Sequence, residues 1–315
     1  MDPKPLWQNP DNRTIMKKKN LWLSLGLLVS LIACKSPLIA QKTQNTLLWK
    51  VSGKGMAKPS YLFGTMHVLC ADDAHLSNGL RDVIHSVDEV YFEIDLGDMS
   101  GMLKAMKFMK MNDSKKLSDL LPPKDYERVR GYFTKHGSAL PFGMLERFKP
   151  MLISGLLEEQ SMGCKTTDGM ELMIMKELKT ARNGDTSAKK IHGLETVEFQ
   201  AGLFDSIPYE QQAKELLNYI DSADHYTKAT ADLAEVYKQQ DLDKIDALSQ
   251  KEDAGMAGYM DLLLYGRNRK WVSILGGTLG NRSLLVAVGA AHLPGEQGVI
   301  NLLRKQGYTV TPLKN

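Results

Sequence analysis

Two short motifs each place a histidine directly after an apolar stretch of chain. They read Gly64-Thr65-Met66-His67 and Gly289-Ala290-Ala291-His292. In each, the glycine lets the backbone turn and approach a ligand closely. Both motifs follow runs that are predicted to be strands, so the histidines are expected at the sheet edge where α/β proteins bind ligands. If the two strands belong to one sheet, the two imidazoles can converge.

Glu93 is the expected third member of this group. It lies in the apolar run 90–94, one strand–helix–strand crossover after His67. Parallel strands connected in this way end at the same edge of a sheet. A buried carboxylate must be paired or metal-bound, and two histidines with one carboxylate form a common open metal set. The alternative is that Glu93 pairs with an arginine and stabilises the core. Asp95 is a second candidate for the carboxylate.

The hydrophobic pattern that must position these residues predicts an α/β fold. Helical spacing is seen at 76–87 and 298–306, and the middle of the chain, about 98–270, is mainly helical with one short strand at 190–195. We therefore expect a mixed sheet built from the N- and C-terminal thirds, with a helical insertion between them. The strands are expected at 47–51, 60–64, 90–95, 283–288 and 308–313.

The first 40 residues are expected to direct export. Residues 1–15 fit no signal design and are interpreted as a start-site artefact, whereas 16–40 combine three lysines with a 13-residue apolar stretch, 21–33. Cleavage before Cys34 would leave an outer-membrane or periplasmic lipoprotein anchored through a lipidated cysteine. Cleavage before Gln41 would leave a free periplasmic or secreted protein. Either way, 41–315 is expected to form one domain.

The body of the chain is nearly neutral. Residues 41–315 hold 34 basic and 35 acidic side chains without a basic stripe, which argues against a nucleic-acid partner. The same part of the chain holds two cysteines, Cys70 and Cys164. They are either a disulfide formed in an oxidising compartment or two buried thiols, and the sequence leaves both alternatives open.

Further segments carry a resemblance to a known family. The two histidine motifs, together with YFEID, GLET, GRNRKW and VAVGAAHLPGEQGV, resemble the TraB/GumN family over about residues 46–313. That family is similar to the Tiki metalloproteases and more distantly to erythromycin-esterase and ChaN-like proteins. The resemblance implies an erythromycin-esterase/ChaN-like α/β fold, an active site lined by His67, Glu93 and His292, and a metal-dependent peptidase that favours manganese or cobalt.

The resemblance also draws in residues from the helical region. Arg267 matches an Arg-Asn element, Glu195 belongs to the GLET element, and Gln200 follows it closely. An arginine at the site would hold a substrate carboxylate or stabilise an oxyanion; the alternative is a structural ion pair with Glu93 or Glu195. Asp168 is similar to a family position or caps the helix after it.

The sequence contains no Gly-x-Ser-x-Gly elbow, HExxH helix or phosphate loop. We therefore expect an exported metal-dependent hydrolase that acts on a peptide or small molecule. His67, Glu93 and His292 would hold manganese, cobalt or zinc, and Arg267 would stabilise developing charge. The alternatives are a haem- or other apolar-ligand-binding lipoprotein of the ChaN-like type, and an accessory lipoprotein without turnover. Met102, Met106 and Met109 share one helical face, which suits either an apolar ligand or core packing.

Overall fold

The computed structural model describes residues 45–98, 100–101, 106–180 and 189–315. The chain separates into Met1–Lys42 and Thr43–Asn315, and the fold described below belongs to the second unit. The predictions for residues 1–40, including Cys34, lie outside the described residues. In the part of the chain that the structure describes, no helix is both long enough and apolar enough to cross a membrane.

Six strands form one mixed sheet in the order β6-β4-β7-β2-β1-β8. β6, β4, β7 and β2 run parallel to one another, and β1 runs antiparallel to its neighbours β2 and β8. The predicted α/β fold is confirmed, with the edge strand β6 added from the middle of the chain. The strands are β1 (Leu48–Ser52), β2 (Ser60–Thr65), β4 (Glu89–Ile94), β6 (Lys190–Glu195), β7 (Leu284–Gly289) and β8 (Thr309–Pro312).

β7 lies at the centre of the parallel part of the sheet. Its run of apolar residues is buried almost throughout, as expected for a strand covered on both faces. The chain passes from β2 through α1 (Asn78–Ser86) to β4, but β7 lies between these two strands instead of leaving them adjacent. The carboxyl ends of β2, β7 and β4 therefore meet at one edge of the sheet, with β7 in the middle.

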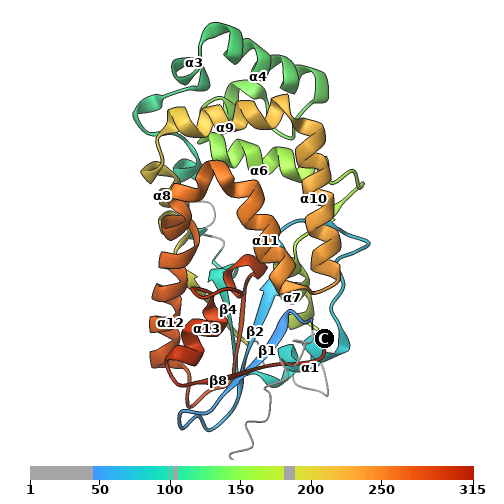
Figure 1. Cartoon of the computed structure of the whole chain (residues 1–315), viewed down its shortest axis with the longest axis vertical. Helices are drawn as coiled ribbons and strands as arrows, with labels where there is room; N and C mark the ends of the chain where they lie inside the picture. Colours follow the sequence, from blue (N-terminus) through green and yellow to red (C-terminus); the bar gives the residue numbers. More distant parts are fainter. Residues whose placement is uncertain (1–44, 99, 102–105, 181–188) are drawn as a thin grey trace, which may run out of the picture. The chain divides into compact units, whose positions relative to one another are not determined.

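Helices cover the sheet and pack a large core against it. Figure 1 shows α12 and α13 on one side of the strands and α1 and α7 on the other. All four contribute buried side chains to the same core as the central strands, including Leu80, Ile174, Trp271 and Leu303. These helices are α7 (Met170–Leu178), α12 (Gly266–Thr278) and α13 (Val299–Lys305).

A second hydrophobic cluster forms within the predicted helical insertion, beyond the carboxyl edge of the sheet (Figure 1). Its buried members come mainly from α4 (Pro123–His136), α6 (Pro150–Ser161) and α9 (Tyr209–Asp221). α10 (Ala223–Lys238) and α11 (Leu242–Glu252) lead from this layer back to the sheet. Further helices in the described part of the chain are α3 (Leu117–Leu120), α5 (Phe142–Leu145) and α8 (Val197–Leu203). There is also a π-helix at Asp261–Tyr265, and short 3-10 turns lie at Met106–Met109, Asn112–Ser114, Phe204–Ser206, Asp253–Tyr259 and Ala290–His292.

A small two-stranded sheet lies beside the main one and is absent from the sequence prediction. It pairs β3 (Leu69–Cys70) with β5 (Thr167–Asp168), and two-residue strands carry too little pattern to be predicted. A disulfide joins Cys70 to Cys164 at this point, which selects the disulfide over two free thiols. The pair ties the segment after His67 to the segment before α7.

Candidate active site

The two histidine motifs pack directly against each other. Thr65 at the end of β2 is in register with Gly289 at the end of β7. A Cβ on Gly64 would come within 3.1 Å of Ala290, so the first glycine allows the second motif to approach. A Cβ on Gly289 would lie 3.2 Å from Glu93 Oε1, 3.5 Å from His292 Cδ2 and 3.9 Å from His67 Nε2. The missing side chain of Gly289 therefore leaves a small space that all three predicted residues surround.

Glu93 is held as a carboxylate on the buried end of β4. The Gly289 N–H donates to its Oε1 atom at 2.9 Å, and Gln200 Nε2 and Arg267 Nη2 donate to its Oε2 atom at 2.8 and 2.6 Å. Burial on its own would raise the pKa of Glu93, but the Arg267 guanidinium and the hydrogen bond from the Gly289 N–H help to lower it to about 2. Glu93 is therefore ionised at neutral pH.

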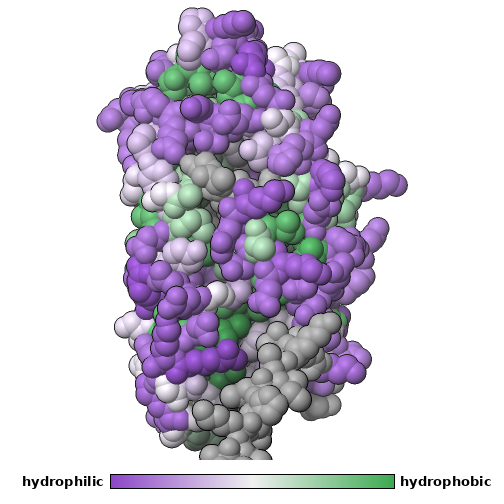
Figure 2. Space-filling view, viewed as in Figure 1, coloured by the Kyte–Doolittle hydropathy of each residue, from purple (hydrophilic) through white to green (hydrophobic). Residues whose placement is uncertain are grey.

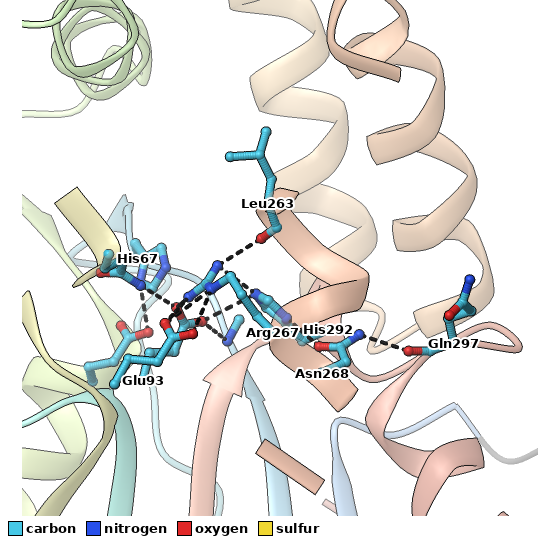
Figure 3. Close-up of polar contacts among 11 residues, drawn as sticks. His67, Glu93, Leu263, Arg267, Asn268, His292 and Gln297 are labelled. Carbon is cyan, nitrogen blue, oxygen red and sulfur yellow. Dashed lines mark hydrogen bonds and ion pairs between the residues drawn. The ribbon is translucent and has the colours of Figure 1, made fainter. Parts of the chain in front are cut away.

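Arg267 is the buried cation of the site, as Figure 3 shows. Its Nε donates to both oxygens of Glu195, at 3.2 and 3.0 Å, and its Nη2 binds Glu93. Its Nη1 donates to the carbonyl of Leu263 at 2.9 Å and faces His292 Nε2 at 3.3 Å. Both structural ion pairs considered from the sequence are therefore present, and Arg267 also lines the cavity described below. Coulombic attraction to Glu93 and Glu195 outweighs burial and raises the pKa of Arg267.

A chain of three residues sets the tautomer of His292. Asn268 Nδ2 donates to the carbonyl of Gln297 at 2.9 Å, which directs Asn268 Oδ1 toward His292 Nδ1 at 2.6 Å (Figure 3). Because a carbonyl oxygen can only accept, Nδ1 carries the proton and Nε2 presents a lone pair toward Arg267. Burial, with Arg267 nearby, lowers the pKa of His292 to about 3, so the ring is neutral.

His67 differs from His292 in exposure and charge. Its side chain is 65% exposed, and its Nδ1 lies 2.8 Å from Oε1 of Glu171, a mostly buried carboxylate on α7. The contact with Glu171 raises the pKa of His67 to about 9. Sequence reasoning missed Glu171, and the only local signal was Asp168-Gly169 before the helix. Met170 N–H donates to the carbonyl of Met66 at 3.0 Å, which fixes α7 beside the first motif.

The donor types suit a divalent metal, although they are not arranged as a metal centre. Gly289 leaves a space bounded by an ionised carboxylate and two imidazoles, and His292 Nε2 has no proton, as a ligand nitrogen requires. Among the described residues, however, no three His, Cys, Asp or Glu side chains are placed to hold an ion. The guanidinium of Arg267 already contacts both Glu93 and His292, and His67 carries a proton. The residues are therefore of the types that bind a divalent metal, and a metal would compete with the Arg267 guanidinium for Glu93 and His292.

A cavity of about 790 Å³ opens above these residues. It lies between the carboxyl edge of the sheet and the helical layer, because its lining comes from both. His67, Glu93, Arg267 and His292 form its polar wall, and Met106 and Met109 are among its apolar lining. Met106 is 53% exposed, so core packing is wrong for this methionine, while Met102 lies outside the described residues.

The side chains of two other residues singled out in the sequence contact only residues nearby in the chain. Asp95 Oδ1 accepts from the Gly97 N–H at 2.8 Å in a turn and does not line the cavity. Asp168 forms an ion pair with Lys176 at 3.1 Å, and the residue at the N-cap of α7 is Gly169. The proposed cap is therefore wrong, because the helix begins one residue later than a cap at Asp168 requires.

Comparison with known proteins places the chain in a family. Residues 47–312 match the model of the TraB/PrgY/gumN family, and the chain belongs to that family. It is 25% identical to Metalloprotease TIKI2 of Danio rerio over 88% of this chain and 62% of that protein. It is 24% identical to Metalloprotease TIKI homolog of Amphimedon queenslandica over 86% of this chain and 62% of that protein.

Metalloprotease TIKI1 of Homo sapiens is 23% identical over 86% of this chain and 62% of the human protein. The chain thus spans about three fifths of the length of these curated relatives. No solved structure is significantly similar to it. The matches therefore support membership of a distant metallopeptidase-like family.

Proposed function

We propose that the protein is a hydrolase of peptide-like bonds that works with a divalent metal, and that His67, Glu93 and His292 are the ligands. The observation that supports this most is the space at Gly289, which these three side chains surround at the wall of a large cavity. The relatives named as metalloproteases support the same reaction class. When bound, manganese, cobalt or zinc would supply a Lewis acid that makes water a nucleophile at neutral pH.

The chain's own residues supply the remaining chemistry. His67 has the Glu171 carboxylate on its Nδ1 side and its Nε2 near Gly289, so Glu171 would orient the ring with Nε2 toward the metal position. Arg267 holds positive charge at the cavity wall, where it stabilises an oxyanion that develops in the transition state. Ligation through His67 Nε2 requires the imidazolium to lose the proton on that nitrogen while Nδ1 keeps its contact with Glu171, so metal binding would release a proton.

Metal analysis and single substitutions test this function. We expect His67→Ala, Glu93→Gln and His292→Ala each to abolish hydrolysis of a peptide library supplied with manganese, cobalt or zinc. Each should also lower the metal content measured after dialysis, because each removes one of few ligands. His75→Ala is the matched control and should change neither quantity. Wild-type metal content and activity in all three variants would refute the ligand assignment.

An apolar-ligand-binding role without turnover is the second candidate, because the cavity walls are mainly apolar. Haem is the ligand to titrate first, since a protein of this role would shift the Soret band at stoichiometric haem. An unshifted band would remove haem binding. A shifted band together with no hydrolysis of any library member would favour this role over the enzyme.

We also propose that the protein is exported and anchored to a membrane through lipidated Cys34, with release after Ala40 as the competing outcome. Expressed from Met16, the wild-type protein should be recovered in the membrane fraction, and Cys34→Ala should move it to the soluble fraction. Gln41 as the N-terminal residue of the purified native protein would reject the lipoprotein.

A further inference from the structure

The cavity has one polar wall and is otherwise mainly apolar. Its apolar lining comes from the sheet edge, the turn at Met106–Met109, and helices α6, α8, α10 and α11, together with the π-helix before α12. Its larger apolar residues include Met109, Leu152, Leu203, Phe204, Leu233 and Leu263. By contrast, the outer face in Figure 2 is mostly hydrophilic, and its apolar side chains show as small separate patches. A ligand that enters the cavity exchanges water for hydrocarbon on most of its sides.

The charged groups of the polar wall are already paired with one another. Glu93 accepts hydrogen bonds on both oxygens, and the nitrogens of Arg267 face Glu93, Glu195, Leu263 and His292. His67 is paired with Glu171. The lining of the described chain includes no lysine and no aspartate. A charged ligand group would therefore lose its hydration and gain only partners whose charge is already balanced, which is costly in an apolar cavity.

The volume of the cavity is that of a small-molecule binding site. Small-molecule sites in proteins span roughly 300–1,000 Å³ and bury most of a drug-sized ligand. At about 790 Å³, this cavity lies in the upper part of that range. Because the polar groups gather at the sheet edge, a ligand would place its reactive bond there and extend an apolar portion toward Leu152 of α6 and Leu233 of α10.

We propose that the natural substrate carries a large, uncharged hydrocarbon portion next to the bond that is cleaved. The cleavage itself rests on the proposed function, whereas the binding preference stands on the cavity alone. Two sources share this chemistry: a run of apolar residues in a peptide, and an acyl chain. Haem fits less well, because its two carboxylates would find no free cation on the described cavity walls.

Equilibrium binding tests the preference without turnover. The probe is N-phenyl-1-naphthylamine, an uncharged fluorophore that brightens in apolar surroundings, titrated into the purified domain. We expect saturable binding at one site. A blocked tri-leucine amide and decanamide should displace it, whereas blocked tri-lysine and tri-glutamate should compete at least 10-fold more weakly. Displacement by only one uncharged ligand identifies the peptide or the acyl source. Equal competition by the charged peptides, or failure of both uncharged ligands, would overturn the proposal.

Substitution of one residue in the cavity wall, followed by the same probe titration, provides the second test. Leu152→Glu should weaken probe binding at least 10-fold, while the volume-conserving Leu152→Met should leave it within 3-fold of wild type. Ile274→Glu is the matched control, because Ile274 is exposed on α12 and does not line the cavity. If Leu152→Glu fails to fold, the wild-type competition decides the matter. Unchanged binding in a folded Leu152→Glu would contradict the proposal, while normal probe binding with no hydrolysis would remove only the proposed enzyme.

Discussion

Asn268 Oδ1 lies 2.6 Å from His292 Nδ1, and this contact determines which nitrogen of the imidazole carries the proton. Asn268 follows Arg267 directly on α12, so one helix delivers both the residue that orients His292 and the cation that faces its other nitrogen. The Arg-Asn pair in the sequence is therefore a structural unit in which each residue contacts a different nitrogen of one ring.

Replacing Asn268 with alanine should free the tautomer of His292. Asn268 is fully buried, so we expect a loss of about 1–3 kcal/mol in the free energy of unfolding from the groups left without partners. Hydrolysis and metal content should both fall, since the proton can then occupy Nε2. Denaturant unfolding, activity and metal analysis would measure these effects. Asn281→Ala, at an exposed position, should change none of them.

Arg267→Ala should cost about 3–5 kcal/mol of stability, because it leaves the buried carboxylates of Glu93 and Glu195 without their cation. Arg267→Lys keeps the charge but cannot reproduce the planar set of contacts, so it should recover only part of the loss. The neighbouring Arg269 binds Asp261 at the surface, and Arg269→Ala should cost at most about 1 kcal/mol. Equal costs at the two positions, measured by denaturant unfolding, would show that the buried network is not what Arg267 stabilises.

The convergence of His67, Glu93 and His292 could be predicted because each follows from a local pattern and one general rule. Apolar runs fixed the strands, and parallel strands end at a common edge. The same reasoning gave β2 and β4 the correct direction. It did not place β7 between them, because strand order depends on contacts between residues nearly 200 positions apart in the chain, such as Glu89 with Leu284.

Three features could not be predicted in this way: the contact of Glu171 with His67, the roles of Asn268 and Gln297, and the cavity. Glu171 reaches His67 because a hydrogen bond between Met170 and Met66 fixes α7, and nothing in the spacing of those residues reveals that contact. The cavity exists because two separate hydrophobic clusters leave space between them. Apolar patterns show which residues avoid water. They do not distinguish a side chain that packs in the core from one that lines a cavity, as Met106 illustrates.

The ion pair between His67 and Glu171 should make stability depend on alkaline pH. The pKa of His67 is raised to about 9 in the folded protein from its ordinary value of 6.5. The stabilising effect is therefore complete below pH 6.5 and is lost as the pH rises through about 9. Glu171→Gln should remove this part of the pH dependence and return the pKa of His67 toward 6.5. NMR titration of the His67 ring and unfolding at several pH values would measure both, and an unshifted His67 would contradict the pairing.

The disulfide between Cys70 and Cys164 should stabilise the domain by about 2–4 kcal/mol, because it closes a long loop in the unfolded chain. Unfolded oxidised protein should show no free thiol from this pair. Reductant should lower the melting temperature of the wild type and leave a Cys70→Ser/Cys164→Ser double variant unchanged. Activity should fall with reduction as well, since the bridge ties the segment after His67 to the segment that leads into α7.

Gly289→Ala isolates the space at the centre of the site. The glycine has φ −47° and ψ 135°, an extended conformation that alanine also adopts, so the backbone should tolerate the change with about 1 kcal/mol or less of lost stability. The added methyl group, however, would press on Glu93 Oε1 and fill the space that faces His67 and His292. We expect hydrolysis to fall on the order of 10²-fold, as small displacements of reacting groups do, and metal content to fall with it. Gly277→Ala is the matched control, because it lies on α12 with open space around its Cβ and should gain about 0.5–1 kcal/mol. A folded Gly289→Ala protein with full metal content and activity would show that this space is not where the chemistry takes place.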